Sequence, residues 1–242
     1  MATPVFVAVD TPDLEAATSM VGSLQMPGLG VKLGLEFFCA HGAAGVRSVV
    51  EAAGSAPLFL DLKFHDIPNT VAGAVRATVG LGAALLNVHA GGGPEMMRAA
   101  AAAAAEEAER LGVPRPAMLA VTVLTSLDDA DLVAVGQAPP VREQVVRLAK
   151  LAKECGMDGV VCSAAEISAI REACGPTFQL VVPGIRPAGA AVGDQKRVMT
   201  PAQAMAAGAT SLVVGRPITR ADEPRVAAEA VVAEARGAAP PA

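Results

Sequence analysis

One short stretch of the sequence concentrates charged side chains where a buried strand is expected to end. The apolar run Leu58–Leu62 contains Asp61 and continues into Lys63, and Asp66 follows three residues later. Because side chains alternate across a strand, Asp61 and Lys63 project from the same face. Two carboxylates beside an ammonium can form a preorganised site for a reaction in which charge develops. A structural ion pair is the alternative, but three alternating charges that run directly into the segment Ile67–Thr70 favour a functional site.

Charges also occur at the expected ends of the first two strands, where apolar residues are usual. Asp10 follows the first strand and Lys32 lies in the second. Lysine is almost never buried unless it is paired, so we expect Lys32 to pair with Asp61, and Lys63 with Asp66. The result would be a row of alternating charges, which is either a structural ion network or a preorganised electrostatic site.

Two arginines follow glycines after the expected seventh and eighth strands. They are Arg186, in the segment 184–186, and Arg216, which follows Gly215. Barrel enzymes often bind phosphate after these strands, because glycine lets backbone N–H groups approach an anion and arginine adds a bidentate guanidinium. Surface arginines beside turn glycines are the alternative, but the two segments together favour a phosphate site. The glycine patterns of nucleoside triphosphate and dinucleotide sites do not occur in the sequence.

The segment 184–197 is too long for a simple turn between a strand and a helix. Loops of this kind are commonly lids or binding loops. From such a lid, Gln195 could reach a phosphate or a base. A solvated loop side chain is the alternative interpretation of Gln195.

The three histidines do not favour a metal site. His65 could join the carboxylates around it as a ligand, but Lys63 would place a positive charge in the same site. We therefore predict no metal and no cofactor. His41 is expected in a helix and His89 at the end of the fourth strand, and neither is given a catalytic role.

Strand-like runs alternate with helix-like segments along the chain. This alternation predicts parallel strands joined by right-handed crossovers, and eight such units favour a closed (β/α)8 barrel. We expect one α/β domain over residues 1–236 and a frayed tail over residues 237–242. Helix caps are expected at Thr11 and Thr200, each before a proline. The predicted strands are Val5–Val9, Leu29–Leu33, Leu58–Leu62, Ala84–His89, Met118–Leu124, Gly159–Cys162, Gln179–Val182 and Ser211–Val214.

The composition suits a barrel and excludes several classes of partner. Charged residues make up 18% of the chain, which is below the usual quarter and fits strands buried on both faces. The net charge of -5 gives no reason to expect nucleic acid as a partner. No apolar run reaches transmembrane length, and the four cysteines lack metal-binding spacing. We therefore expect a cytoplasmic protein with reduced thiols and no membrane partner.

Together, these segments resemble the bacterial type of orotidine 5'-phosphate decarboxylase over nearly the whole chain. The core Asp-x-Lys-x-x-Asp is also shared by related hexulose-phosphate synthases and keto-gulonate-phosphate decarboxylases, which use Mg²⁺. The Ile-Pro-Asn-Thr extension and the Arg186 loop favour the nucleotide decarboxylase. One departure is Gly91, where a hydroxyl residue is expected. The matching segments are 31–34, 61–70, 121–126, 182–186, 193–195 and 215–217.

The resemblance implies decarboxylation of orotidine 5'-monophosphate to uridine 5'-monophosphate in pyrimidine biosynthesis, without a cofactor. Lys63 would protonate the pyrimidine C6 within a network of Lys32, Asp61 and Asp66. The resemblance also implies a homodimer in which Asp66, Ile67 and Thr70 belong to the neighbouring subunit's site. The implied substrate contacts are Asp10 and Lys32 at the ribose, Thr125 and Ser126 at the pyrimidine, Gln195 between base and phosphate, and Arg186, Gly215 and Arg216 at the phosphate.

Two other functions stay open from the sequence. One is a metal-dependent sugar-phosphate lyase on the same barrel, which a chelator would inactivate. The other is a non-catalytic barrel, which would bind uridine monophosphate without turning over orotidine monophosphate. The complete set of Asp61, Lys63 and Asp66 disfavours the non-catalytic barrel.

Overall fold

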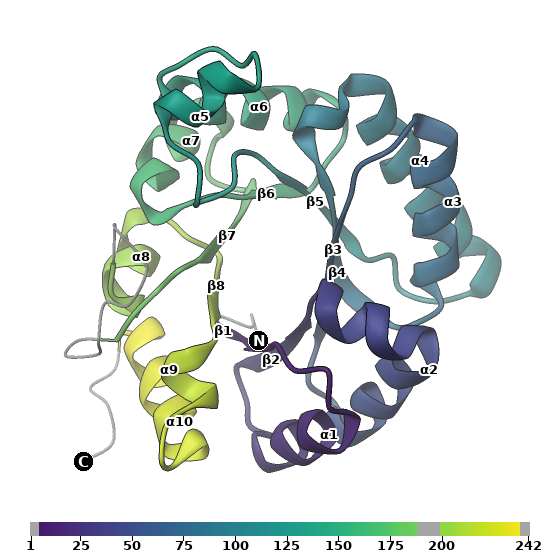
Figure 1. Cartoon of the computed structure of the whole chain (residues 1–242), viewed down its shortest axis with the longest axis vertical. Coiled ribbons are helices and arrows are strands. Elements are labelled where there is room, and N and C mark those ends of the chain that lie inside the picture. The colour runs from purple at the N-terminus through teal and green to yellow at the C-terminus, as the bar shows by residue number, and fades with distance from the viewer. Residues whose placement is uncertain (1–4, 188–198, 238–242) are drawn as a thin grey trace.

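The computed structural model describes residues 5–187 and 199–237 of the chain. Within these ranges, parallel strands close into a barrel in sequence order, with helices around the outside (Figure 1). The predicted fold class, a single-domain (β/α)8 barrel, is confirmed. The strands are β1 Val5–Val9, β2 Leu29–Leu33, β3 Leu58–Phe64, β4 Ala83–His89, β5 Ala117–Val121, β6 Gly159–Val161, β7 Gln179–Pro183 and β8 Ser211–Val214.

The helices occupy the intervals between consecutive strands and follow the last one. None of those in the described ranges has both the length and the apolar character needed to cross a bilayer. They are α1 Leu14–Ser23, α2 Leu35–Ala53, α3 Pro68–Val79, α4 Pro94–Leu111, α5 Asp129–Ala134, α6 Val141–Glu154, α7 Ile167–Cys174, α8 Pro201–Ala207, α9 Arg216–Thr219 and α10 Pro224–Ala235, with short turns η1 Ala90–Gly92 and η2 Ala164–Glu166.

One of the two predicted helix caps is wrong. Helix α1 is capped by Asp13, whose carboxylate accepts the N–H of Ala16 at 2.9 Å. The hydroxyl of Thr11 instead accepts the N–H of Asp13, so it shapes the turn before the helix. The second cap is confirmed, because Thr200 and a glutamine three residues later form a reciprocal capping box at the start of α8.

The interior of the barrel is filled by a small apolar cluster that is separate from the larger core between strands and helices. The rings of Phe6 and Phe59 meet edge to face inside it, with centroids 6.0 Å apart. Glycine is needed at Gly30, because a Cβ there would lie 2.6 Å from the ring of Phe6. The buried members are Phe6, Ala8, Phe59, Leu85, Leu119, Val181 and Val213.

Strand periodicity places polar side chains directly above this apolar layer. Lys32 lies two residues beyond Gly30 on β2, and Asp61 lies two residues beyond Phe59 on β3. Because every second side chain of a strand faces the same way, both point into the barrel at its carboxyl end. The apolar layer is therefore the floor of the site described next.

Candidate active site

Strand β3 contains a bulge where it carries the site. Two pairs of the β3–β4 ladder enclose residues 61–63 on β3 but only Asn87 on β4. Lys63 lies in this bulge with a φ of 49°, in the left-handed region that residues other than glycine rarely adopt. A residue held there costs about 1–3 kcal/mol, so its surroundings must stabilise it.

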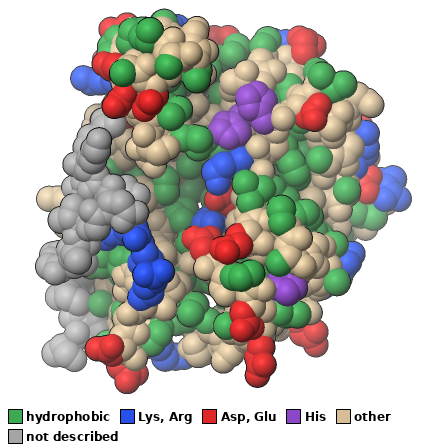
Figure 2. All heavy atoms as spheres, viewed as in Figure 1, with side chains coloured by type: hydrophobic (Ala, Val, Ile, Leu, Met, Phe, Trp, Pro, Cys, Tyr) green, Lys and Arg blue, Asp and Glu red, His purple; other side chains and the backbone are tan. Residues whose placement is uncertain are grey.

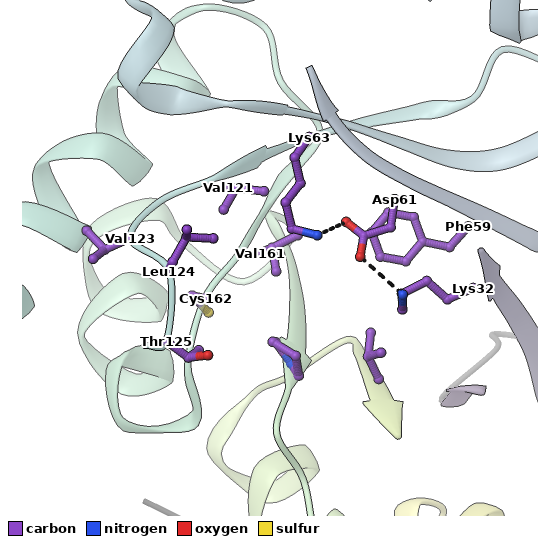
Figure 3. A pocket seen from close by; sticks show the side chains of 12 residues that line it. Lys32, Phe59, Asp61, Lys63, Val121, Val123, Leu124, Thr125, Val161 and Cys162 are labelled. Carbon is purple, nitrogen blue, oxygen red and sulfur yellow. Dashed lines mark hydrogen bonds and ion pairs between the residues drawn. The ribbon is translucent and has the colours of Figure 1, made fainter. Parts of the chain in front are cut away.

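The bulge brings the predicted charges into contact as a row. The Nζ of Lys32 lies 3.2 Å from Asp10 Oδ1 and 3.3 Å from Asp61 Oδ2. The Nζ of Lys63 lies 2.7 Å from Asp61 Oδ1. Figure 3 shows both lysines pointing at Asp61 from opposite sides. Lys32 and Asp61 are only 7% and 8% exposed, so each charge depends on its partners to be buried.

Asp61 is a carboxylate at neutral pH. Burial raises the pKa of Asp61. The ammonium groups of Lys32 and Lys63, with the hydrogen bonds from Lys63 and Asn87, together lower this pKa by a larger amount. The net effect holds the pKa of Asp61 below its usual value. The site therefore presents a fixed negative charge between two positive ones.

Asp66 does not complete this row within one chain. It is exposed, and its Oδ1 accepts the N–H of Ile67 at 2.6 Å. In residues 5–187 and 199–237 no ion pair joins Lys63 and Asp66, so the expected direct pairing is absent from the single chain. Ile67 and Thr70 are also exposed at this rim of the barrel.

A cavity of about 210 Å³ opens beside the row of charges and reaches Thr125. Ser126 is exposed next to it. Burial raises the pKa of the Cys162 thiol, so Cys162 is a neutral wall of the cavity rather than a nucleophile. The cavity is lined by Lys32, Phe59, Asp61, Lys63, Val121, Val123, Leu124, Thr125, Val161, Cys162, Pro183 and Val213.

A second cavity, of about 370 Å³, lies beyond the Lys32–Asp10 ion pair. Asp10 lines it together with Gly215 and Arg216, at the start of α9. Lys32 lines the first cavity, so this ion pair joins a residue of one cavity wall to a residue of the other. A ligand that spans both would place an anionic group near Arg216 and a reactive carbon near the row of charges.

Arg186 and Gln195, predicted to contact phosphate and base, stay untested in these roles. Arg186 follows β7 and is buried, with Nη1 donating to the carbonyl of Ile185 at 3.1 Å. Gln195 lies outside the described residues, and its predicted contact with base and phosphate stays a prediction.

Comparison with known proteins assigns the chain to a protein family. The model of the "Orotidine 5'-phosphate decarboxylase / HUMPS family" matches residues 3–231. The chain is 58% identical to the orotidine 5'-phosphate decarboxylase of Moorella thermoacetica over 231 residues, which cover 95% of this chain and 91% of that protein. The chain belongs to this family.

Further orotidine 5'-phosphate decarboxylases agree with this assignment. The protein of Thermobifida fusca is 50% identical over 99% of this chain and 100% of its own length. The crystal structure of the protein from Lactobacillus acidophilus matches with a TM-score of 0.83 and 38% identity, over 96% of this chain and 99% of that one. The resemblance seen in the sequence is thereby confirmed at the level of the family.

Sequence reasoning assigned no role to one polar residue of this decarboxylase-family site. Asn87 is completely buried and contacts both Asp61 and Lys63. Its position in the otherwise apolar run 83–88 was the available signal, because a buried polar side chain needs partners.

Histidines border the charged centre of the barrel mouth. Figure 2 shows lysine or arginine and acidic side chains meeting in the central hollow, with histidines beside them. The rings of His65 and His89 are 5.2 Å apart. Burial, and then the nearby His65 and Lys63, lower the pKa of His89, against a smaller opposing effect of Asp61. His89 is therefore neutral at pH 7.

We expect acidification to destabilise the wild-type protein more than a His89→Gln variant. The stability linked to this depressed pKa is present above the unfolded value of about 6.5. It is lost as the pH falls through the lower folded value, because the unfolded chain then binds more protons. Melting temperatures at about pH 7.5 and about pH 5.5 measure the difference. The control is His41→Gln, on the outer helix α2, and equal pH dependence in wild type and His89→Gln would contradict the assignment.

Proposed function

We propose that this chain removes carbon dioxide from orotidine 5'-monophosphate, giving uridine 5'-monophosphate for pyrimidine biosynthesis, with no cofactor. The observation that carries the proposal is the row Asp10–Lys32–Asp61–Lys63 beside a cavity at the barrel mouth. The names of the relatives described above support the substrate. A second cavity, lined by Arg216, lies near the row of charges, and this arrangement supports a ligand with a remote phosphate.

The row supplies the stabilisation that this reaction needs. Breaking the bond between C6 and the carboxylate leaves an electron pair on C6, which the pyrimidine ring delocalises poorly. The ammonium of Lys63 stabilises this pair as it forms and then donates a proton to C6. The amine regains its proton from water. The carboxylate of Asp61 holds the Nζ of Lys63 in place at 2.7 Å.

Repulsion between Asp61 and the substrate carboxylate is a smaller contribution. Two like charges about 4 Å apart at an effective dielectric near 20 repel by about 4 kcal/mol. Enzymatic accelerations require about 8–23 kcal/mol, so this repulsion supplies a minority of the total. Stabilisation of the transition state by Lys63 and the remote phosphate contacts must supply more.

The remaining contacts of the substrate follow from the two cavities. Asp10 and Lys32 lie between them and suit the ribose hydroxyls. Arg186, Gly215 and Arg216 are assigned to the phosphate, whose binding energy is used to hold the base against the row. At the pyrimidine end the assignments are Thr125 and Ser126, with Gln195 between base and phosphate.

The charge set favours this reaction over a metal-dependent lyase on the same barrel. In the described part of the chain, no three His, Cys, Asp or Glu side chains form a group suited to a metal ion. Both carboxylate oxygens of Asp61 are already engaged, one by Lys32 and the other by Lys63 and Asn87. A divalent ion would have to displace an ammonium to reach this carboxylate.

We also propose that the active form is a homodimer with Asp66, Ile67 and Thr70 serving the partner's site. Its support is the exposed rim after β3, where Ile67 is 66% exposed. Mixing inactive Lys63→Ala and Asp66→Asn chains should restore activity, because a mixed dimer contains one site with both residues intact. Mixtures without regained activity at any ratio would contradict shared sites.

Incubation with orotidine monophosphate in heavy water tests the reaction. We expect uridine monophosphate that carries one deuterium at C6, because the proton on Lys63 exchanges with solvent before it is donated. Failure to form uridine monophosphate, with binding intact, would favour the non-catalytic barrel. Mass spectrometry of the nucleotide distinguishes these results.

A further inference from the structure

The side chain of Asn87 bonds both to the carboxylate of Asp61 and to the main-chain N–H of Lys63, at the two ends of the bulge in β3. Its Nδ2 donates to Asp61 Oδ1 at 2.6 Å, and its Oδ1 accepts the backbone N–H of Lys63 at 2.7 Å. The side chain is 0% exposed, so both hydrogen bonds are shielded from water. One planar amide therefore fixes two groups of the charged row at once.

The chemistry of these partners requires an amide. Asp61 is ionised and only accepts, whereas the N–H of Lys63 only donates. A carboxylate at position 87 would lack the N–H that donates to Asp61. An aliphatic side chain would lack both this donor and the oxygen that accepts from Lys63. Asn87 is thus matched to its two partners in a way that neither aspartate nor leucine reproduces.

The amide also accounts for the backbone conformation of Lys63. In the described β3–β4 ladder Lys63 has no paired residue, because the register shifts between Leu60 and Phe64. The Oδ1 of Asn87 takes the place of the missing strand carbonyl. It thereby stabilises the φ of 49° that directs the Lys63 side chain back toward Asp61.

Three sets of donors then hold the Asp61 carboxylate. Oδ1 accepts from Asn87 and from Lys63, while Oδ2 faces Lys32 at 3.3 Å. Without the amide, the carboxylate can rotate and the backbone of Lys63 can relax. Both movements change where the ammonium lies relative to the cavity.

We propose that Asn87 is a positioning residue for decarboxylation, which sets the place of the Lys63 ammonium through Asp61 and the bulge. This inference rests on the proposed function of Lys63. Asn87 is completely buried and lines neither of the two cavities. Its loss should therefore affect the chemical step more than nucleotide binding.

The test compares Asn87→Leu and Asn87→Asp with the wild type. Leucine removes both hydrogen bonds, whereas aspartate keeps an acceptor for Lys63 but sets a second carboxyl group against Asp61. We expect kcat to fall about 100-fold in each, since a misplacement of about 1 Å costs this much. The KM for orotidine monophosphate and the affinity for uridine monophosphate should change less than about threefold.

A matched control separates positioning from general loss of stability. Thr78→Val removes a buried side chain's hydrogen bonds to its own helix α3, away from the charged row. We expect it to lower the melting temperature without changing kcat. If Asn87→Leu does not fold, Asn87→Asp decides the outcome, because its oxygen still satisfies the N–H of Lys63.

Crystal structures of the two Asn87 variants give a readout that does not depend on activity. We expect Lys63 to leave its left-handed conformation or to separate from Asp61. Unchanged geometry at this pair, or kcat equal to that of Thr78→Val, would overturn the inference. Absence of turnover in the wild type would instead contradict the proposed function, and the crystallographic comparison would still decide whether Asn87 positions Lys63.

Discussion

Replacing Lys63 with alanine is expected to abolish turnover of orotidine monophosphate while leaving the barrel folded. The ammonium is both the stabilising charge and the proton donor in the proposed reaction. Proton transfer by a positioned group contributes about 10²–10⁴-fold and a preorganised charge about 10²–10³-fold. We therefore expect kcat to fall by at least about 10⁴-fold.

The fold should survive this change, because Asp61 keeps Lys32 and Asn87 as partners. Alanine also retains a Cβ, so the backbone strain at position 63 stays similar. The control is Lys153→Ala, whose ammonium contacts the Cys174 carbonyl on the outside of the barrel. Initial rates measure turnover, circular dichroism measures folding, and a titration with uridine monophosphate measures nucleotide binding. A Lys63→Ala enzyme that retained most of its activity would show that another group donates the proton.

Replacing Arg216 with alanine is expected to weaken nucleotide binding and to slow turnover at saturation. A guanidinium makes charge-assisted hydrogen bonds to phosphate, worth about 1.5–3 kcal/mol each. We expect KM to rise about 100-fold. We also expect kcat to fall about tenfold, because phosphate binding energy helps to hold the base against the row of charges.

The matched control for this prediction is Arg225→Ala. Arg225 is an exposed arginine of α10 that pairs with Glu229 four residues later. Its loss should leave both kinetic constants unchanged. A higher KM in Arg216→Ala with an unchanged kcat would mean that the phosphate contributes only uniform binding.

Much of the barrel could be predicted because buried parallel strands are apolar runs with clear ends. Strands β1, β2 and β8 have the predicted bounds. Strand β5 was predicted to reach Leu124 but ends at Val121. Val123 and Leu124 are apolar because they line the cavity. An apolar pattern alone does not distinguish a strand residue from a cavity wall.

The contacts of the site were only partly predictable. Alternation along β3 predicted Asp61 and Lys63 on one side, and the pairing of Lys32 with Asp61 followed from the cost of burying charge. The ion pair between Lys63 and Asp61 was not predicted, because Lys63 was expected to pair with Asp66. The bulge could not be foreseen, because a left-handed φ at a lysine has no sequence signal. The same holds for the role of Asn87, which depends on that bulge.

Contacts between chains cannot be read from the periodicity of one chain. Asp66 was expected beside Lys63 because it lies only three positions later in the sequence. In the structure its carboxylate instead accepts from the loop N–H of Ile67. The resemblance, rather than spacing, pointed to a role for Asp66 in a neighbouring subunit, and only the mixing experiment addresses it.

The central claim is that fixed charges at the barrel mouth perform a decarboxylation without a metal or a cofactor. The most direct measurement is the rate of conversion of orotidine monophosphate by purified protein after treatment with EDTA and dialysis. We expect a kcat unchanged by the chelator and by added Mg²⁺. Activity that is lost with EDTA and restored by Mg²⁺ would contradict it.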